Sequence, residues 1–552
     1  MSQYIKPHPH WEDHEKPFMP GSPSAPHHES HIRVAYGLVA ILVGLTGGLG
    51  NALVSVNLPT LQGELGLTPS EVAWLPAAYA MVNITANLLV FKFRQQYGMR
   101  LFAEIGLGLY AVLALLHLSI DSAESLILLR GASGFSGAAA STLGVLYMLQ
   151  AFPRRLLGKA LVLGVSITQL ATPLAWVLSP SLIELGNWHG LYSFEAGMAL
   201  CAFAAVVLLK LPPGYQIKAF EKLDFLAFAL FAPAAGLLIA FLTQGYIRWW
   251  FNDTNLAWMA IGSLFLFTLC SFLEYHRVNP LVKVRWLAQG STIYFAVGAM
   301  ILRFITTEQN YGMVNMLRTL GMGSEQMQPL FWVVFLGIVC GIALSAVTFG
   351  PRTILVQVFT AILLIGISSF MDFGRTSMDR PHDFFYSQFV LSIGAGMFMG
   401  PLVMIGFKQA FKYGPDHIVT FIVLLNVTQT LGGLLGTATL STFEQQRQQH
   451  HYAAIVSHLN VADPLVANRL KQQQLAVGSV ITDPVLRAAT GTAQLAQTAR
   501  REANVRAYND VFLLIGILAT GFLLWPVLLA AGPAIQSRRA NAASGTSSHS
   551  ST

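Results

Sequence analysis

The chain has 552 residues, of which 54% are hydrophobic and only 11% are charged, and its mean hydropathy is +0.55. Soluble domains carry about a quarter charged residues, so this composition excludes an ordinary soluble protein and indicates an integral membrane protein. The net charge of +7 does not indicate nucleic-acid binding, because the Lys and Arg residues stand singly or in small groups at the ends of apolar runs.

Residues 1–32 are polar and rich in proline and histidine. No apolar core follows the first methionine, so we expect no cleaved signal peptide and a disordered tail that stays in the cytoplasm. The histidines of this tail are candidate metal ligands, but the composition favours a solvated segment without a metal. Residues 532–552 are predicted as a second cytoplasmic tail.

From Arg33 onward, fourteen apolar segments are long enough to cross a bilayer as helices. Lys and Arg are concentrated in the two tails and in the even-numbered short loops, which places both ends of the chain in the cytoplasm. The predicted segments are 33–57, 72–91, 101–119, 125–150, 158–183, 191–209, 224–244, 255–273, 291–310, 328–349, 352–371, 383–406, 416–441 and 509–531.

The fourth segment carries an arginine inside an apolar run. Arg130 lies roughly 7 Å into this run at ~1.5 Å per residue. A charge at membrane depth is costly, so such a residue faces a protein interior or a watery cavity. The residues that share its helical stripe are small, which permits close approach of a neighbouring helix; they are Gly134, Gly137, Ser141 and Gly144. The alternative is a side chain that snorkels to the nearer interface.

Residues 442–508 are the only sizeable segment that is predicted outside the bilayer. Apolar residues at helical spacing predict short amphipathic helices on the outer face. His450, His451 and His458 have no cysteine or carboxylate cluster beside them. A surface that docks a partner is therefore favoured over a metal site.

Several stretches together resemble one known family. They are ILLRGASG at 127–134, LVSVNLPTL at 53–61, the Trp and Tyr pattern of 72–79, the Leu-Asp-Phe of 223–225, and 426–451 running into the long loop. These are similar to the major facilitator superfamily, in its fourteen-helix drug:proton antiporter branch of the EmrB/QacA type.

The resemblance implies an all-α integral membrane protein with fourteen transmembrane helices. In this fold two six-helix halves, here 33–210 and 286–531, flank two inserted helices at 211–285, and the external loop 442–508 lies within the second half. The resemblance is incomplete at several motifs. In the loop after helix 2, Phe91, Gln95 and Gln96 replace the glycine, acid and arginine of the motif. The helix 5 motif is reduced to TPLAWVLSP at 172–180. Gly50 and Asn51 stand where the branch carries a helix 1 aspartate, and Gln429 stands where an arginine is frequent in helix 13.

A carrier coupled to protons needs an ionisable group that meets each side of the membrane in turn. Because the helix 1 acid is missing, the candidates are Glu195, early in helix 6, and Glu308, late in helix 9, with Arg130 as a nearby charge. The alternative for each glutamate is an interfacial residue that bonds to a neighbour.

Arg303 lies roughly 18 Å into helix 9, near the middle of the bilayer. In the superfamily the substrate site lies at that depth between the two halves. Arg303 therefore either meets an anionic substrate or forms a salt bridge within the second half. Further polar residues are candidates for the cavity lining: Asn51, Asn83, Asn87, Gln169, Gln388, Asn426 and Gln429. The alternative for each is a side chain that forms a hydrogen bond between two helices.

These features predict a proton-coupled secondary transporter of the inner (plasma) membrane that exports small apolar or amphipathic compounds by alternating access. The likeness to EmrB implies a periplasmic adaptor (membrane fusion) protein and an outer-membrane channel as partners, reached through loop 442–508. No phosphate-binding G-x-x-x-x-G-K motif occurs, and no catalytic or metal-binding constellation stands out, so we expect no enzyme, cofactor or metal. Two rival functions stay open: an uptake carrier of the same fold, and a non-transporting sensor or scaffold derived from it.

Overall fold

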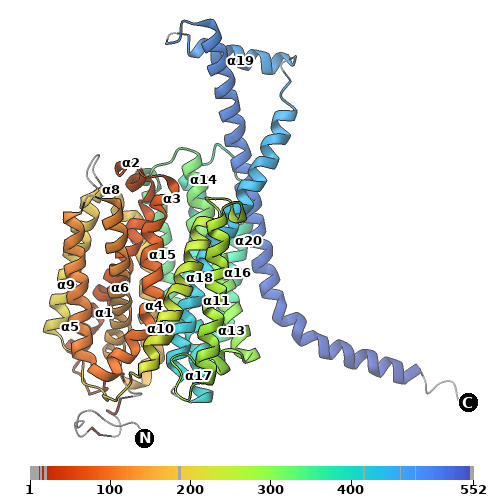
Figure 1. The fold of residues 1–552 in the computed structure, drawn as a ribbon. Coiled ribbons are helices and arrows are strands. Elements are labelled where there is room, and N and C mark those ends of the chain that lie inside the picture. Colours follow the sequence, from red (N-terminus) through yellow and green to blue (C-terminus); the bar gives the residue numbers. More distant parts are fainter. Residues whose placement is uncertain are drawn as a thin grey trace, which may run out of the picture.

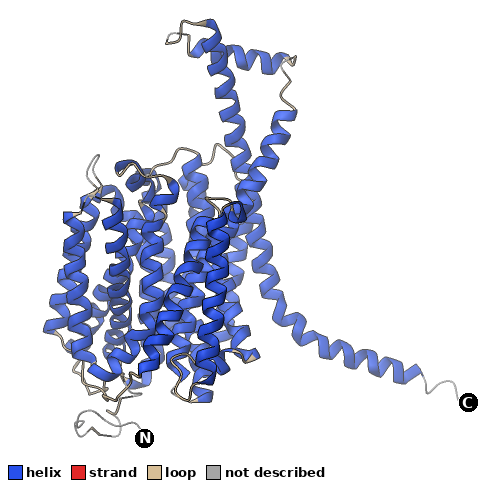
Figure 2. Ribbon diagram, viewed as in Figure 1, coloured by secondary structure: helices blue, strands red, loops and turns tan. Residues whose placement is uncertain are grey.

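Fourteen helices among the described residues are long and apolar enough to cross a membrane, which confirms the predicted all-α fold. The helices run alongside one another as a bundle, and a helical hairpin projects from one end of it (Figures 1 and 2). We call that end the hairpin face. The computed structural model describes residues 11–12, 15–17, 21–120, 122–183, 188–414, 417–460, 462–478 and 480–546, with side chains as far as residue 525.

The first half is built around α6 (Ala123–Ala151), which packs against α1, α4, α5 and α7. Close packing depends on the small-residue stripe of α6: a Cβ added at Gly134 would lie 2.3 Å from the Tyr79 carbonyl oxygen of α4, and one at Gly144 would lie 2.9 Å from the Gly44 Cα of α1. The other membrane helices of this half are α1 (Ser30–Val56), α4 (Trp74–Tyr97), α5 (Met99–Leu116), α7 (Leu157–Ser166) continued by α8 (Ala171–Leu182), and α9 (His189–Leu208). Two short helices, α2 (Leu58–Glu64) and α3 (Pro69–Val72), connect α1 to α4.

Helix 5 is not continuous. A 3₁₀ turn over Ile167–Leu170 separates α7 from α8. Such a turn in the middle of a helix changes the direction of its side chains and often marks a functional position. Here it carries Gln169 at the wall between the two halves.

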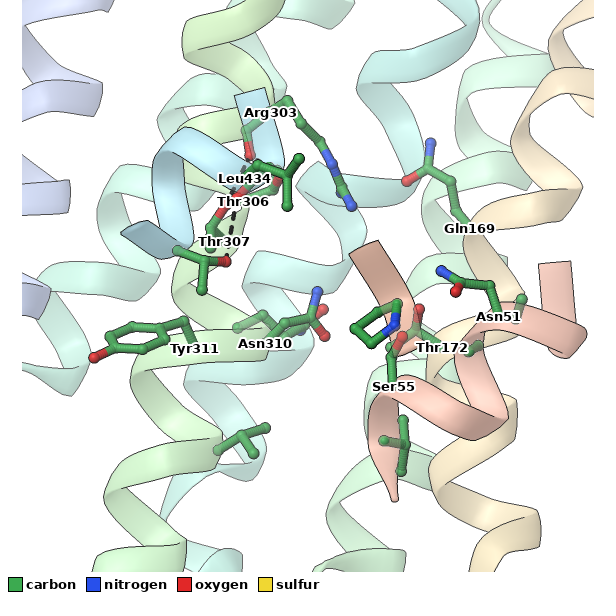
Figure 3. Close-up of a pocket in the computed structure, with 18 of the residues that line it drawn as sticks. Asn51, Ser55, Gln169, Thr172, Arg303, Thr306, Thr307, Asn310, Tyr311 and Leu434 are labelled. Carbon is green, nitrogen blue, oxygen red and sulfur yellow. Dashed lines mark hydrogen bonds between the residues drawn. The ribbon is translucent and has the colours of Figure 1, made fainter. Parts of the chain in front are cut away.

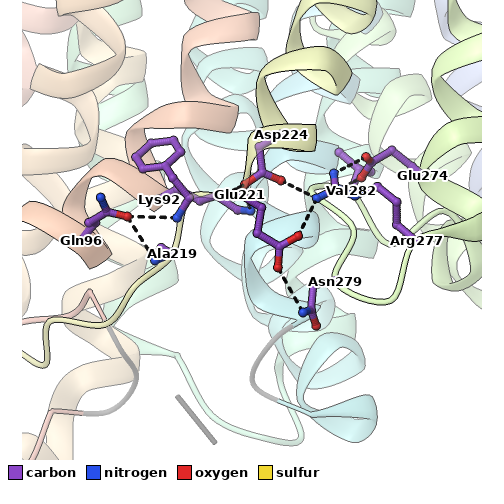
Figure 4. Close-up of polar contacts among 10 residues, drawn as sticks. Lys92, Gln96, Ala219, Glu221, Asp224, Glu274, Arg277, Asn279 and Val282 are labelled. Carbon is purple, nitrogen blue, oxygen red and sulfur yellow. Dashed lines mark hydrogen bonds and ion pairs between the residues drawn. The ribbon is translucent and has the colours of Figure 1, made fainter. Parts of the chain in front are cut away.

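The two inserted helices, α10 (Lys222–Gly245) and α11 (Thr254–His276), pack on each other, and α10 also contacts α4 and α18. A network of charges fastens their ends opposite the hairpin face (Figure 4). The buried Asp224 carboxylate accepts bonds from Lys92 of α4 at 2.5 Å and from Arg277 at 2.9 Å. Gln96, which replaces a charged residue of the family motif, accepts the backbone N–H of Ala219 at 3.2 Å. These contacts join the end of helix 2 to the inserted helices.

The second half is likewise built around one central helix. At its centre α17 (Phe385–Tyr413) contacts α15 (Ser324–Val347) and α16 (Ile354–Asp372), and a Cβ at Gly396 would lie 2.4 Å from the Ile338 carbonyl oxygen. Helix 9 consists of α13 (Gly290–Ile305), a π-helical turn (Glu308–Met313) and α14 (Val314–Thr319), after the short α12 (Val284–Leu287). The last membrane helices are α18 (His417–Ser457) and α20 (Pro484–Thr546).

The external segment differs from the short helices that its sequence predicts. Helices α18 and α20 continue beyond the bundle as the two arms of a hairpin, and α19 (Pro464–Ala476) lies near its tip (Figure 1). Residues 437–460 contain neither Gly nor Pro, so nothing in their backbone ends the membrane helix. Arg447 and His451 of α18 contact Asp510 of α20 at 2.6 and 2.7 Å and close the base of the hairpin.

Part of the N-terminal segment lies against the bundle. Ser24 donates its N–H to the Pro213 carbonyl at 3.1 Å and accepts a bond from the Gln150 side chain at 3.0 Å. The expectation of a disordered tail over residues 1–32 therefore does not extend to Ser24 and its neighbours. Residues 1–10 of that tail and 547–552 of the C-terminal tail lie outside the described residues.

Candidate functional site

A cavity of about 870 Å³ lies between the two halves. Helices α1, α4 and the broken helix 5 form one wall, helices 9, α15, α17 and α18 form the other, and the end of α10 closes one side. Pockets for drug-sized molecules measure about 300–1,000 Å³, so this volume suits a small organic molecule. Figure 3 shows polar side chains from both halves around it, among them Asn51, Ser55, Gln169, Thr172, Arg303 and Asn310.

Arg130 lies behind the wall formed by α1. Its side chain is fully buried and does not snorkel. The guanidinium donates to the Gly50 carbonyl at 3.0 Å and to the Asn51 Oδ1 at 3.1 Å, and it stacks on the Tyr79 ring at 4.9 Å. Arg130 therefore fixes the amide of Asn51, whose side chain lines the cavity.

Glu195 reaches the same place from α9. Its Oε1 lies 2.8 Å from the Tyr110 hydroxyl, which is also 3.1 Å from the Thr46 carbonyl. A Cβ added at Gly50 would lie only 2.5 Å from this Oε1. The carboxyl group of helix 6 thus fills the space beside the helix 1 position at which the resembled branch carries an aspartate. No ion pair joins Glu195 to Arg130 among the described residues, and the Gly50 backbone lies between them.

Two further polar residues of this cluster escaped sequence reasoning. His117 is fully buried and stacks on the Tyr192 ring with centroids 4.6 Å apart. Its Nε2, the Tyr192 hydroxyl and the Arg130 Nε have no hydrogen-bond partner in the described part of the chain. A lone histidine in the apolar run of helix 3 was the signal that could have identified it.

Glu308 lies inside the second half, on the π-helical turn. Its Oε1 accepts a bond from Gln388 Nε2 at 3.2 Å, and the same nitrogen donates to Asp372 Oδ2 at 2.9 Å. The other Asp372 oxygen pairs with Arg375 at 2.7 Å. One amide thus bridges two buried carboxyl groups, while Glu308 Oε2 has no partner among the described residues. Asp372 was missed because it follows the predicted apolar segment 352–371 directly, a position that is typical of a solvated loop residue.

Gln309 connects this pair to the cavity. Its backbone follows Glu308 directly, and the residue lines the cavity. The Gln309 amide donates to Gln388 Oε1 at 3.2 Å and to the Ser392 hydroxyl at 2.8 Å. π-helical turns inside α-helices occur frequently at functional sites, because they shift the register of the side chains. Here the turn places Glu308 in the interior and its neighbours Gln309 and Asn310 at the cavity.

Arg303 lines the cavity from helix 9. Gly432 of α18 makes room for its side chain, since a Cβ at Gly432 would lie 2.9 Å from the Arg303 Cβ. Within the described residues no carboxylate lies within ion-pair distance of it, so the salt bridge considered from the sequence is not present there. Figure 3 shows the guanidinium extending toward the side of the cavity that holds Gln169 and Asn51.

The remaining sequence candidates divide into two groups. Asn83, Gln169 and Gln429 line the cavity with Asn51, and Asn83 also donates to the Gly134 carbonyl at 3.1 Å. The others do not line it: Asn87 donates to the Asn83 carbonyl, Gln388 lies in the carboxyl network of the second half, and Asn426 is half-buried on α18.

Comparisons with known proteins agree with this architecture. A model of the Major Facilitator Superfamily matches residues 40–437. The chain is 26% identical over 211 residues to the uncharacterized transporter YebQ of Escherichia coli, covering 38% of this chain and 46% of YebQ. It is 20% identical over 497 residues to the multidrug export protein EmrB of Haemophilus influenzae, covering 86% of this chain and 92% of EmrB.

Among solved structures, the human organic anion transporter MFSD10 aligns with a TM-score of 0.52 at 13% identity, over 89% of this chain and 100% of MFSD10, a likeness of fold alone. The likeness to EmrB agrees with the branch that the sequence motifs predict. Since the family model spans most of the sequence and the bundle has the expected fourteen helices, the chain belongs to the major facilitator superfamily of membrane transporters.

Proposed function

We propose that the protein is a proton-coupled secondary transporter that exports small apolar or amphipathic compounds by alternating access. The proposal places it in the inner (plasma) membrane with both termini in the cytoplasm, in accord with the distribution of Lys and Arg. The observation that carries it is a cavity between two halves, each of which holds a buried carboxyl group behind the cavity wall: Glu195 and Glu308. The likeness to the multidrug export protein EmrB supports export as the direction.

Glu195 is the proton site proposed for the first half. An ionised Glu195 accepts the Tyr110 hydroxyl hydrogen and gains from the positive charge of Arg130 nearby. A protonated Glu195 can donate to the Tyr110 oxygen, while Tyr110 turns its own hydrogen to the Thr46 carbonyl. Each protonation state therefore keeps its hydrogen bonds, which a group that loads and releases a proton in a buried place requires.

The Glu308 and Asp372 pair is the proton site proposed for the second half. Two ionised carboxylates in this apolar interior would repel each other, so one proton on the pair relieves the repulsion. Glu308 Oε2, which has no described partner, is the free position for it. Since Gln388 contacts both acids and Gln309, a change of protonation can reach the cavity wall through two amides.

The hairpin is the surface proposed for a periplasmic adaptor protein, with an outer-membrane channel beyond it. It projects from the bundle at the hairpin face (Figure 1). Apolar side chains of α19 and of the residues after it are exposed. Leu465 and Leu475 of α19 and Val480 and Val485 beside it are each more than three-fifths exposed. Large apolar side chains left exposed within one short segment support a binding surface there.

The proposal is tested with membrane vesicles of both orientations and three naphthalene probes that differ only in their head group: naphthalene-2-sulfonate, naphthalene-2-sulfonamide and a 2-naphthyl trimethylammonium. We expect the pH gradient to drive accumulation of at least one probe in inverted vesicles. Accumulation only in right-side-out vesicles would identify an uptake carrier. If no probe moves in vesicles of either orientation, the non-transporting sensor or scaffold is the function that remains.

The coupling residues are tested in the same vesicles. Glu195→Gln and Glu308→Gln should abolish accumulation driven by the pH gradient but keep exchange of labelled for unlabelled probe, because neither residue lines the cavity. Glu104→Gln is the matched control, since Glu104 pairs with the exposed Arg100. Full coupling in both buried variants would refute the proton sites.

A further inference from the structure

The charges of the cavity wall are all of one sign. Arg303 and Arg318 line the cavity, and none of its lining residues within the described chain is an Asp, Glu, Lys or His. The buried acids of the two six-helix halves are not among the lining residues; they are Glu195, Glu308, Asp372 and Glu444. The wall therefore carries two positive charges without a compensating carboxylate.

Arg303 is the less satisfied of the two arginines. Its guanidinium has no hydrogen-bond or ion-pair partner among the described residues, and only its backbone carbonyl accepts bonds from side chains, the hydroxyls of Thr306 and Thr307. Arg318 donates to the Val56 carbonyl at 2.9 Å and stacks on the Trp176 ring at 5.1 Å, yet it too lacks an acidic partner in the described structure. A guanidinium held away from bulk water without a counter-charge is costly, and a bound anion would remove that cost.

Neutral groups around Arg303 also present hydrogen-bond donors. Arg130 occupies the Asn51 Oδ1, so the Asn51 amide turns its two N–H bonds elsewhere. The Gln169 Nε2 on the opposite wall is buried and has no partner among the described residues. Figure 3 places Arg303, Gln169 and Asn51 around the same space. The buried Gln169 Nε2 does not open into the cavity, so the donors offered here are the Arg303 guanidinium of one half and the Asn51 amide of the other, and such donors suit an oxyanion.

Part of the wall is apolar. Trp176 and Phe331 stack with ring centroids 4.5 Å apart, and Val334, Ile338 and Met399 continue the surface. A ligand that matches both parts has a flat or aliphatic body and one anionic head.

We propose that the cavity selects amphipathic organic anions, carboxylates or sulfonates, with Arg303 as the residue that binds the anionic head. This inference rests on the transport function proposed above and specifies its substrate. Arg318, nearer the hairpin end of helix 9, is the second positive charge that the anion meets on its way through the cavity.

The test compares equilibrium binding and vesicle transport of the three naphthalene probes. The sulfonate stays ionised, so the pH gradient does not drive it across the bilayer without a carrier. Wild-type protein in detergent should bind the sulfonate at least tenfold more tightly than the trimethylammonium probe, which corresponds to about 1.4 kcal/mol. Arg303→Gln should weaken sulfonate binding by a factor of about ten or more, and Arg303→Lys should retain most of it.

Two controls separate charge recognition from loss of structure. The neutral sulfonamide should bind Arg303→Gln as it binds the wild type, and Arg100→Gln, at an exposed arginine outside the cavity, should change nothing. The anion proposal is overturned if the trimethylammonium probe binds as tightly as the sulfonate or more tightly, or if Arg303→Gln binds the sulfonate as the wild type does. In either case, gradient-driven transport of another probe still supports the carrier. Sulfonate binding without gradient-driven movement of any probe overturns the carrier instead.

Discussion

The substitution Gly134→Ala tests whether the close crossing of α4 and α6 holds the Arg130 site in place. A Cβ at this position would lie 2.3 Å from the Tyr79 carbonyl oxygen and 3.1 Å from the Asn83 nitrogen. Both are backbone atoms, so no side chain can turn aside to make room. Because ordinary C···O contacts measure about 3.3–3.6 Å, the two helices must separate by roughly 1 Å.

The expected cost follows from two opposing effects. Forcing one carbon into a packed interior costs about 1–3 kcal/mol, and alanine in a helix is more favourable than glycine by about 0.5–1 kcal/mol. Gly131, three residues earlier on α6, is the matched control, because its added Cβ would lie 3.6 Å from Val82, an ordinary contact. Gly131→Ala should therefore keep or raise stability, while Gly134→Ala should lower it.

Thermal unfolding of the two purified variants, followed by loss of the monodisperse peak in detergent, measures this difference. Transport should follow the same order, since Tyr79 stacks on Arg130 and moves with α4. Equal melting temperatures for the two variants would refute the reasoning, because the clash at Gly134 would then be relieved without separating the helices.

Two further predictions concern regions outside the cavity. Asp224→Asn should destabilise the protein by about 1–3 kcal/mol, because Lys92 and Arg277 lose a buried charged partner; thermal unfolding of Asp253→Asn should match the wild type, because its ion pair with Arg248 is partly exposed and asparagine also caps the N-terminus of α11. Replacing α19, residues 464–476, by a short Gly-Ser linker should leave transport in vesicles unchanged and abolish export from intact cells; unchanged cellular export would refute the adaptor surface.

The membrane fold could be predicted because lipid restricts the solutions that a chain can adopt. Apolar runs of spanning length form helices, and the positions of Lys and Arg indicate which of the loops between them lie on the cytoplasmic side. The glycine stripe of α6 predicted its close packing for the same reason, since only small residues admit a neighbouring backbone. These signals are local, so one sequence carries them completely.

The partners of the buried charges are not local. Glu195 meets Gly50 and Tyr110 from two other helices, and nothing in its own segment specifies them. The π-helical turn at Glu308 adds one residue to a helical turn and shifts the register of the side chains, so a regular helical repeat does not predict which neighbour faces the cavity. Asp372 lies at the end of an apolar run, where composition alone does not separate a buried acid from a solvated one.

The separation of acids from the cavity wall has a consequence for the energetics of the proposed cycle. A carboxylate on the wall would repel an anionic substrate, whereas Glu195 and Glu308 behind it can change protonation while Arg303 keeps its charge. An anion that leaves the cell and a proton that enters it both move positive charge inward. The membrane potential therefore drives both steps, at about 2.3 kcal/mol per charge for each 100 mV. A one-to-one exchange thus draws on the potential twice, which favours anion export even where the pH gradient is small.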